Sequence, residues 1–220
     1  MGFWEEFIPL VLHGAVNTLW VLVISIPASV ALAIALGSAR VYGNAPIKAI
    51  ATAFVVTFRG FPLVVTLFLL FFGLADLGIY LTPYQTATLA FVLCGGSYMS
   101  EYVRGAIRSI DIGQSLAARA LGMTKFQELI YIILPQAIRR ALPGLSNEII
   151  YQIKYSSLAF VVGYEEIFAV SKTFISRYFM PLQVFMVDAA LYLAMTTAAA
   201  YGLRALEYKL RIPGLEMSIR

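Results

Sequence analysis

From Gly113 to Pro135 the chain reads GQSLAARALGMTKFQELIYIILP, the longest hydrophilic interruption in an otherwise apolar sequence. Strong helix formers lie on both sides of a single glycine, Gly122. Because glycine readily takes the left-handed conformation that ends a helix, we expect two short helices hinged at this residue. A flexible loop between two spans is the alternative, but the helical run Ala117–Leu121 favours a rigid, partly apolar projection. Such a projection suits the docking of a partner better than it suits a tether.

The composition excludes a water-soluble domain, because 60% of the residues are hydrophobic and only 13% are charged. A chain of 220 residues with long apolar runs is expected to form one all-α integral membrane domain. The single cysteine, Cys94, excludes a disulfide framework and a cysteine metal site. The lone His13 has no second histidine to join it, so we interpret it as a helix-end residue.

Five transmembrane helices are expected in a single domain, residues 1–220. The run from Phe7 to Ala39 contains no charged residue and is long enough for the first span. The second is interrupted by Arg59–Pro62, so it is either one long kinked helix or an interfacial helix followed by a shorter span. In the third, Cys94–Ser97 is a run of small residues that would let a neighbouring helix approach closely. The expected spans are residues 12–36, 49–74, 84–103, 141–162 and 184–203, with the hydrophilic loop at 108–135.

Positively charged residues lie mainly on one side of these spans. The loop at 108–135, its flanks and the C-terminal tail contain most of the lysines and arginines, whereas the opposite side has only Lys172 and Arg177. By the positive-inside rule, the loop and the C-terminus are cytoplasmic and the N-terminus is outside. The net charge of +4 therefore reflects topology and does not indicate nucleic-acid binding.

The sequence carries no recognisable catalytic motif. It lacks the phosphate-binding Gly-x-x-x-x-Gly-Lys loop and the His-Glu-x-x-His metal motif. We therefore expect a protein that is not an enzyme, binds no cofactor or metal, and cannot hydrolyse ATP by itself.

Polar residues inside the spans are the candidates for a solute path, because ionisable groups in a membrane are costly and usually functional. In the third span Glu101 shares a helical face with two polar neighbours, although an ion pair with Arg104 is an equally good structural explanation. In the fourth span a polar stripe follows the helical period and faces either a watery path or a partner helix. An acid and an amide in one stripe favour the path. The candidate residues are Ser97, Tyr98, Glu101, Glu148, Gln152, Tyr155 and Ser156.

Two further charged residues have other expected roles. Lys154 points away from the stripe and could neutralise an acid on a neighbouring chain. Asp188 begins the last span and is expected to be an interfacial anchor.

The hydrophilic loop resembles the Glu-Ala-Ala loop of the permease subunits of ATP-binding-cassette importers, in particular those of the polar amino-acid group. The family pattern has Glu-Ala-Ala, three residues, Gly, nine residues and Ile-x-Leu-Pro. Leu116 stands where the pattern has Glu. The matching residues elsewhere extend the resemblance over nearly the whole chain; they are Ala117-Ala118, Gly122, Ile132-x-Leu134-Pro135, Asn17-Thr18-Leu19, Arg59-Gly60-x-Pro62-Leu63, Asp111-x-Gly113-Gln114, Gln136-Ala137-Ile138 and Asn147-Glu148.

The resemblance implies a type I importer permease fold in a prokaryotic cytoplasmic membrane, with a coupling-helix loop between spans 3 and 4. It implies two cytoplasmic ATPase subunits that bind ATP and Mg, a second permease chain, identical or homologous, and an extracytoplasmic solute-binding protein. In the family the short helices around the glycine sit in a groove of the ATPase. By matching positions, this role falls on Ala117, Ala118, Leu121, Gly122 and Met123.

The expected function is ATP-driven import of a small polar solute, most simply an amino acid, by alternating access. Family members that carry cationic amino acids tend to have acids where this chain has Val56 and Tyr155, so the resemblance implies a neutral or amide-bearing substrate whose ammonium faces Glu101. A self-sufficient carrier or channel that uses Glu101 and Glu148 as ion sites is the alternative, but such carriers usually show paired repeats with broken helices. A membrane scaffold is a third alternative, and it would not need the polar stripe.

Overall fold

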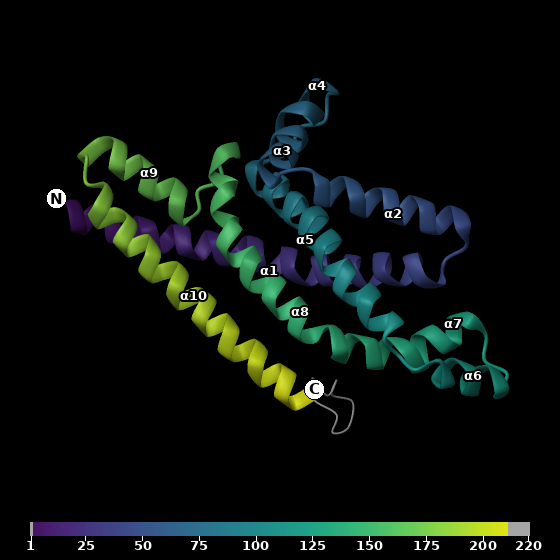
Figure 1. Cartoon of the computed structure of the whole chain (residues 1–220). Helices are drawn as coiled ribbons and strands as arrows, with labels where there is room; N and C mark the ends of the chain where they lie inside the picture. Colours follow the sequence, from purple (N-terminus) through teal and green to yellow (C-terminus); the bar gives the residue numbers. More distant parts are fainter. Residues whose placement is uncertain (1, 211–220) are drawn as a thin grey trace.

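The computed structural model describes residues 2–210, and every regular element in that range is helical (Figure 1). The first helix, α1 (Phe3–Tyr42), has 40 residues and runs along most of the molecule. At 1.5 Å per residue it is about 60 Å long, so it extends well past both ends of the expected first span. The all-α prediction is confirmed.

Small residues bring α1 against α5 (Pro83–Arg108). A Cβ atom at Gly96 of α5 would lie 2.8 Å from Leu32 Cδ2 of α1, and a Cβ atom at Gly37 of α1 would lie 2.8 Å from Val103 Cγ1 of α5. Both distances are shorter than a carbon–carbon contact allows, so each helix needs glycine at the crossing. The close approach expected from the run of small residues at 94–97 is confirmed.

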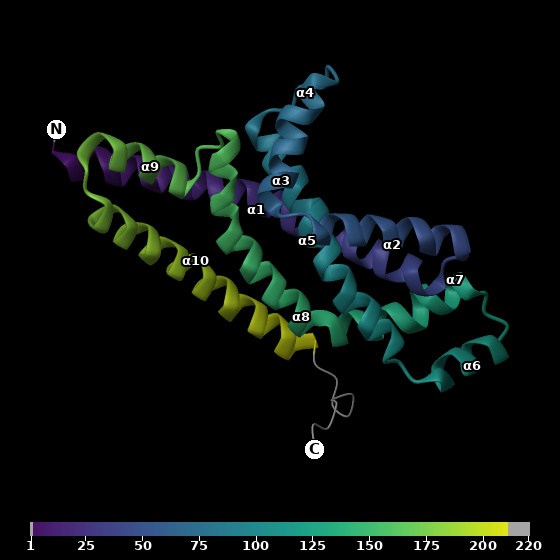
Figure 2. The same ribbon diagram turned by 45° about the horizontal axis from the view of Figure 1, so that its top comes forward.

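The second apolar segment is broken, not kinked. α2 (Ala45–Gly60) is followed by α3 (Leu63–Phe68), a π-helical turn η1 (Leu69–Gly73) and α4 (Leu74–Asp76). The helices before and after the break at residues 61–62 differ in direction by 106°. α2 lies beside the C-terminal half of α1, whereas α3 and α4 rise away from it (Figure 2). Since Pro62 donates no backbone hydrogen bond and disfavours a helical residue before it, one continuous helix is excluded.

The hydrophilic loop has a short helical segment on each side of Gly122, as expected, but the second one merges into the next long helix. α6 (Ile112–Ala120) ends before Gly122, and α7 (Lys125–Gln127) continues through a π-helical turn, η2 (Glu128–Ile133), into α8 (Leu134–Tyr155). Thr124 starts this run with a capping box, in which Gln127 N donates to Thr124 Oγ1 (3.3 Å) and Thr124 N to Gln127 Oε1 (2.9 Å). Pro135 has no backbone N–H to donate to the helix. The wider π turn directly before it lets the helix continue in spite of this missing hydrogen bond.

The chain ends with a 3₁₀ segment η3 (Ser156–Val162), then α9 (Ile167–Tyr178) and α10 (Pro181–Leu210). The carboxylate of Glu6 accepts hydrogen bonds from Arg177 Nη1 and Tyr178 Oη, both at 2.7 Å. These bonds hold the start of α1 beside α9, while α6 and α7 lie at the opposite end of the molecule (Figure 1).

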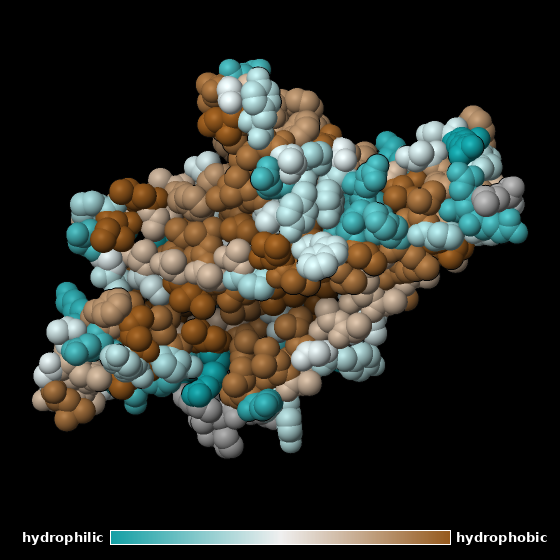
Figure 3. Space-filling view, turned by 180° about the vertical axis from the view of Figure 1, so that it is seen from behind, coloured by the Kyte–Doolittle hydropathy of each residue, from teal (hydrophilic) through white to brown (hydrophobic). Residues whose placement is uncertain are grey.

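Apolar surface covers the middle of the molecule seen from behind, and hydrophilic residues gather mainly toward its two ends (Figure 3). Within residues 2–210, α1 and α10 are long and apolar enough to cross a membrane, and the bent segment Ala45–Asp76 is a third candidate. α5 and α8 are not apolar enough to qualify by composition, although their 26 and 22 residues are long enough to cross a membrane. A core of buried apolar side chains joins α1, α5, η2 and α8.

Candidate coupling site and solute path

The tip of the hydrophilic loop is an exposed turn built on a left-handed glycine. Gly122 has φ +77°, as predicted, and its N–H donates to Arg119 O at 2.9 Å. Met123 N donates to Ala118 O at 3.1 Å, so the last carbonyls of α6 are capped by the turn. Leu121, beside the glycine, is 83% exposed.

The loop residues that were predicted to couple do not all face outward. Ala117, Leu121 and Gly122 are exposed and Met123 is half-buried, whereas Ala118 is buried against the rest of the protein. Sequence reasoning missed three exposed apolar side chains that extend the same surface: Ile112, Leu116 and Phe126. An apolar surface of this kind on a projecting loop is suited to contact with another protein.

A buried carboxylate holds the loop to the body of the protein. Glu128 is fully buried and accepts hydrogen bonds from Tyr42 Oη of α1 (2.8 Å) and Arg119 Nε of α6 (3.0 Å). Burial raises the pKa of this carboxyl, but hydrogen bonds from Ser115, Arg119 and Tyr42 outweigh burial and hold the pKa below its usual value. Sequence reasoning missed Glu128; its position directly before the apolar run at 129–134 was the available signal.

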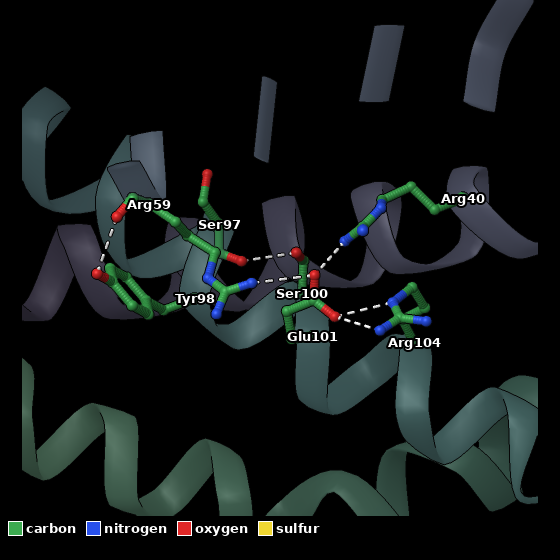
Figure 4. Close-up of polar contacts among 7 residues, drawn as sticks. All are labelled: Arg40, Arg59, Ser97, Tyr98, Ser100, Glu101 and Arg104. Atoms are coloured by element: carbon green, nitrogen blue, oxygen red, sulfur yellow. Dashed lines mark hydrogen bonds and ion pairs between the residues drawn. The ribbon is translucent and has the colours of Figure 1, made fainter. Parts of the chain in front are cut away.

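Glu101 lies at the centre of an ion-pair cluster (Figure 4). One carboxylate oxygen lies 2.6 Å from Arg40 Nη1 and 3.1 Å from Arg59 Nη1, and the other lies 2.6 Å from Arg104 Nη2. The cluster therefore joins α1, α2 and α5 and carries a formal net charge of +2, from three arginines and one glutamate. The structural explanation considered for Glu101, a pair with Arg104, is present, and two distant arginines add to it.

The neighbours of Glu101 do not form one exposed polar face. Tyr98 Oη donates to Arg59 O at 3.1 Å, and its ring lies 5.2 Å below the Arg59 guanidinium. Ser97 is buried, and its carbonyl accepts from Ser100 Oγ at 2.7 Å. An ammonium group could reach Glu101 only by displacing an arginine, so the proposed role of this acid as a free substrate ligand is unfavourable.

The polar stripe of α8 is buried within the chain. Gln152 and Ser156 are fully buried and Glu148 nearly so. Gln152 Nε2 donates to Ser25 Oγ of α1 at 2.9 Å. A Cβ atom at Gly95 of α5 would lie 2.9 Å from Gln152 Oε1 and 3.0 Å from Tyr155 Oη, so the glycine provides the room for both polar groups. The stripe thus packs against α1 and α5 of the same chain. Among residues 2–210, no hydrogen bond or ion pair joins the stripe to Glu101.

At the opposite end of the molecule, two acids are buried. Glu166 accepts hydrogen bonds from Phe168 N (2.8 Å), Ala169 N (2.7 Å) and Tyr192 Oη (2.9 Å), so it caps α9 and ties it to α10. Asp188 is buried and accepts from Ser171 Oγ at 2.5 Å. The expectation that Asp188 is an interfacial anchor is therefore wrong, because α9 covers it.

Asn17, one of the residues that carry the family resemblance, has a structural role. Its side-chain Nδ2 donates to Glu165 O at 2.8 Å, and its own carbonyl accepts from Tyr164 Oη at 2.7 Å. These bonds fix the turn before α9 on α1. Within the described range, no three His, Cys, Asp or Glu side chains come together as a metal site.

These features define a class of protein: a helical membrane protein with a projecting, partly apolar loop and no nucleotide-binding motif in its sequence. Comparison with known proteins gives the family. Residues 16–211 match the model of the binding-protein-dependent transport system inner membrane component, and the chain belongs to this family.

Characterised relatives and solved structures agree with this assignment. The glutamine transport system permease of Escherichia coli is 33% identical over 207 residues, covering 93% of this chain and 94% of the relative. The octopine transport system permease of Rhizobium meliloti is 36% identical, with 94% and 88% covered. A chain of a crystal structure of an amino acid ABC transporter superimposes with a TM-score of 0.83 at 28% identity, covering 95% of this chain and 99% of that one. A chain of the inward-facing MetNI methionine transporter has the same fold, with a TM-score of 0.79 at 18% identity and 96% and 100% covered.

The protein is therefore a permease subunit of an ATP-binding-cassette importer with the type I fold. It is a transport component and not an enzyme, since a separate subunit hydrolyses ATP in this family. The alternative of a self-sufficient carrier is excluded by the same assignment.

Proposed function

We propose that two chains of this kind form the membrane part of an importer that carries a neutral or amide-bearing amino acid into the cytoplasm. The observation that carries the proposal is similarity to amino-acid permeases along nearly the whole chain. Two ATPase subunits dock on the loop tip around Leu121 and Gly122, and an extracytoplasmic binding protein delivers the solute. Five spans fit this assembly: α1, the bent segment α2–α4, α5, α8 with η3, and α10.

The charges of the described residues support a neutral substrate. Glu101 is neutralised by three arginines, which leaves no free acid there for a cationic side chain. Val56, at a position where permeases for cationic amino acids tend to have an acid, is an exposed apolar residue near the end of α2.

The function is tested with the purified permease, ATPase and binding protein in proteoliposomes that contain ATP. We expect ATP-dependent uptake of L-glutamine that exceeds uptake of L-arginine. Faster uptake of arginine would contradict the substrate class, and an assembled complex that transports no amino acid would contradict the function.

Replacing Glu101 by glutamine is expected to destabilise the end of the molecule where α1, α2 and α5 meet. The amide leaves three arginines without a counter-charge in a partly buried site, at a cost of roughly 1–3 kcal/mol. The midpoint of thermal unfolding in detergent should fall by several degrees. Glu207→Gln is the control, because Glu207 lies outside the three-arginine cluster. An unchanged midpoint would show that the ion pairs contribute nothing measurable.

The proposed topology predicts which surface is accessible from outside the cell. In a Cys94→Ser background, a cysteine at exposed Thr173 of α9 should react with an impermeant thiol reagent in intact cells, and one at exposed Lys125 should not. Permeabilised cells provide the control, because both positions should then react. The reverse pattern in intact cells would overturn the orientation.

A further inference from the structure

One face of α8 is open, and it is not the face of the predicted stripe. Ile150 and Lys154 of α8 and five residues of α10 line a cavity of about 310 Å³. A second cavity of about 750 Å³ lies nearer to α6 and is lined by α5, α8 and α10, including Arg139 and Arg140. Arg204 of α10 borders both cavities, and the two neighbouring cavities between α8 and α10 are here called the α8–α10 groove.

The α8–α10 groove has an excess of positive charge. Its cations are Lys154, Arg204, Arg139 and Arg140, and its acids are Glu101 and Glu207. Ion pairs with three arginines that do not line the groove already neutralise the charge of Glu101. Among residues 2–210, Glu207 is the one remaining acid that lines the groove and can offset the four cations, so the groove attracts an anionic group.

The depth and exposure of Lys154 indicate that the groove faces water or another protein chain, and not lipid. About 21 Å of helix separates it from Arg140 at 1.5 Å per residue, within a hydrocarbon layer of about 30 Å. Lys154 is exposed, and it has no ion pair among residues 2–210; its ammonium lies 5.2 Å from the ring centre of Tyr151. A charged side chain at this depth would be costly against lipid and is expected at a partner chain or a water-filled cavity.

An anionic lipid headgroup is the rival occupant. Basic pockets between helices on the cytoplasmic side bind such headgroups, and Arg139, Arg140 and Arg204 would suit one. A headgroup at that level does not reach Lys154, which lies far deeper. Cations at both levels of the groove, Lys154 and the arginines, favour a solute that moves along it.

We propose that the α8–α10 groove guides the carboxylate of the transported amino acid toward the cytoplasm, with Lys154 and Arg204 as successive contacts. This inference rests on the proposed function. Every amino acid carries the α-carboxylate, so the groove recognises the substrate class and leaves side-chain selection to other residues. In a low-dielectric path a fixed cation offsets the desolvation cost of that carboxylate.

Thiol labelling of the assembled importer tests whether the α8–α10 groove contains water. In a Cys94→Ser background, Thr197→Cys places a thiol in the groove, and Ile24→Cys places one on an exposed apolar position of α1. A charged methanethiosulfonate reagent, applied to permeabilised membranes, should modify the groove thiol at least about tenfold faster, because thiolates form in water and not in lipid. Equal rates would overturn the proposal.

Uptake measurements test the two contacts. Lys154→Met and Arg204→Gln should each slow ATP-driven L-glutamine uptake about tenfold, the loss of one charge-assisted contact, without lowering co-purification of the ATPase. Lys154→Arg should retain most of the uptake. Lys209→Gln is the matched control, since this exposed lysine on the same helix does not line the groove.

Each remaining outcome has a distinct meaning. Normal uptake by Lys154→Met and Arg204→Gln, with an active wild type, overturns this inference alone. If the wild-type importer takes up no amino acid, the proposed function fails and the inference with it. An unlabelled groove thiol, together with thermal stabilisation by phosphatidylglycerol vesicles that Arg204→Gln abolishes and inorganic phosphate does not reproduce, would assign the groove to lipid.

Discussion

Replacing Gly122 by glutamate is expected to release the ATPase subunits while the permease remains in the membrane. Gly122 has φ +77°, and a side chain in this conformation costs about 1–2 kcal/mol of backbone strain. The new carboxylate would also lie beside Leu121, in the middle of the exposed apolar tip. Both effects act on the docking surface, so most of the co-purifying ATPase and ATP-driven uptake should be lost.

A matched control separates docking from general instability. Gly78, in the turn after α4, has φ +82° and open space around it, as Gly122 does. The end of α4 lies far from α6 and α7 (Figure 1). Gly78→Glu imposes the same backbone strain and should leave the ATPase bound. Full co-purification and uptake in Gly122→Glu would show that the tip is not the docking surface.

The features that the sequence predicted correctly depend on local chemistry. The left-handed conformation of Gly122 follows from its position after a run of helix formers, and the close approach of α1 follows from the small residues around Gly96. The interruption at Arg59–Pro62 follows from the geometry of proline, although the sequence left a kinked helix and a broken one as alternatives. Neighbouring residues determine each of these features, so no knowledge of the tertiary structure was needed.

The features that it did not predict depend on residues far apart in the chain. Arg104 is one helical turn from Glu101, so the sequence predicts this ion pair. Arg40 and Arg59 reach the same carboxylate from other helices, and no local sequence pattern predicts these contacts. The helical period shows that Glu148 and Gln152 share a face of α8, yet it does not say which face α1 and α5 cover. The packing of α10 decides that the opposite face, with Lys154, borders the groove.

The second large effect is expected at Glu128. Glu128→Leu keeps the approximate volume of the side chain and removes the acceptor for both Tyr42 and Arg119. We expect the ATPase to remain active while its stimulation by solute and binding protein is largely lost, because α6 is no longer tied to α1. Uptake should fall more than ATP hydrolysis does.

Hydrogen exchange of the α6 backbone amides measures directly how far Glu128→Leu destabilises the attachment of α6 to α1. Hydrogen bonds to a charged group contribute about 1.5–3 kcal/mol each, but the Arg119 side chain is half exposed, so solvent screens its share. A net loss of about 2 kcal/mol would speed exchange of the α6 amides roughly 30-fold. Glu128→Gln, which keeps an acceptor oxygen without the charge, should give an intermediate rate.

The pH dependence distinguishes the carboxylate from a purely steric role. Since the folded-state pKa of Glu128 lies below its unfolded value, its contribution is fully present at neutral pH and is lost as the pH falls through the lowered pKa. The wild type should therefore show acid-induced acceleration of α6 exchange that Glu128→Leu lacks. Adding Arg119→Ala to Glu128→Leu should change little, because the two residues share one interaction. Additive effects, or normal α6 exchange in Glu128→Leu, would show that this carboxylate does not hold the coupling loop.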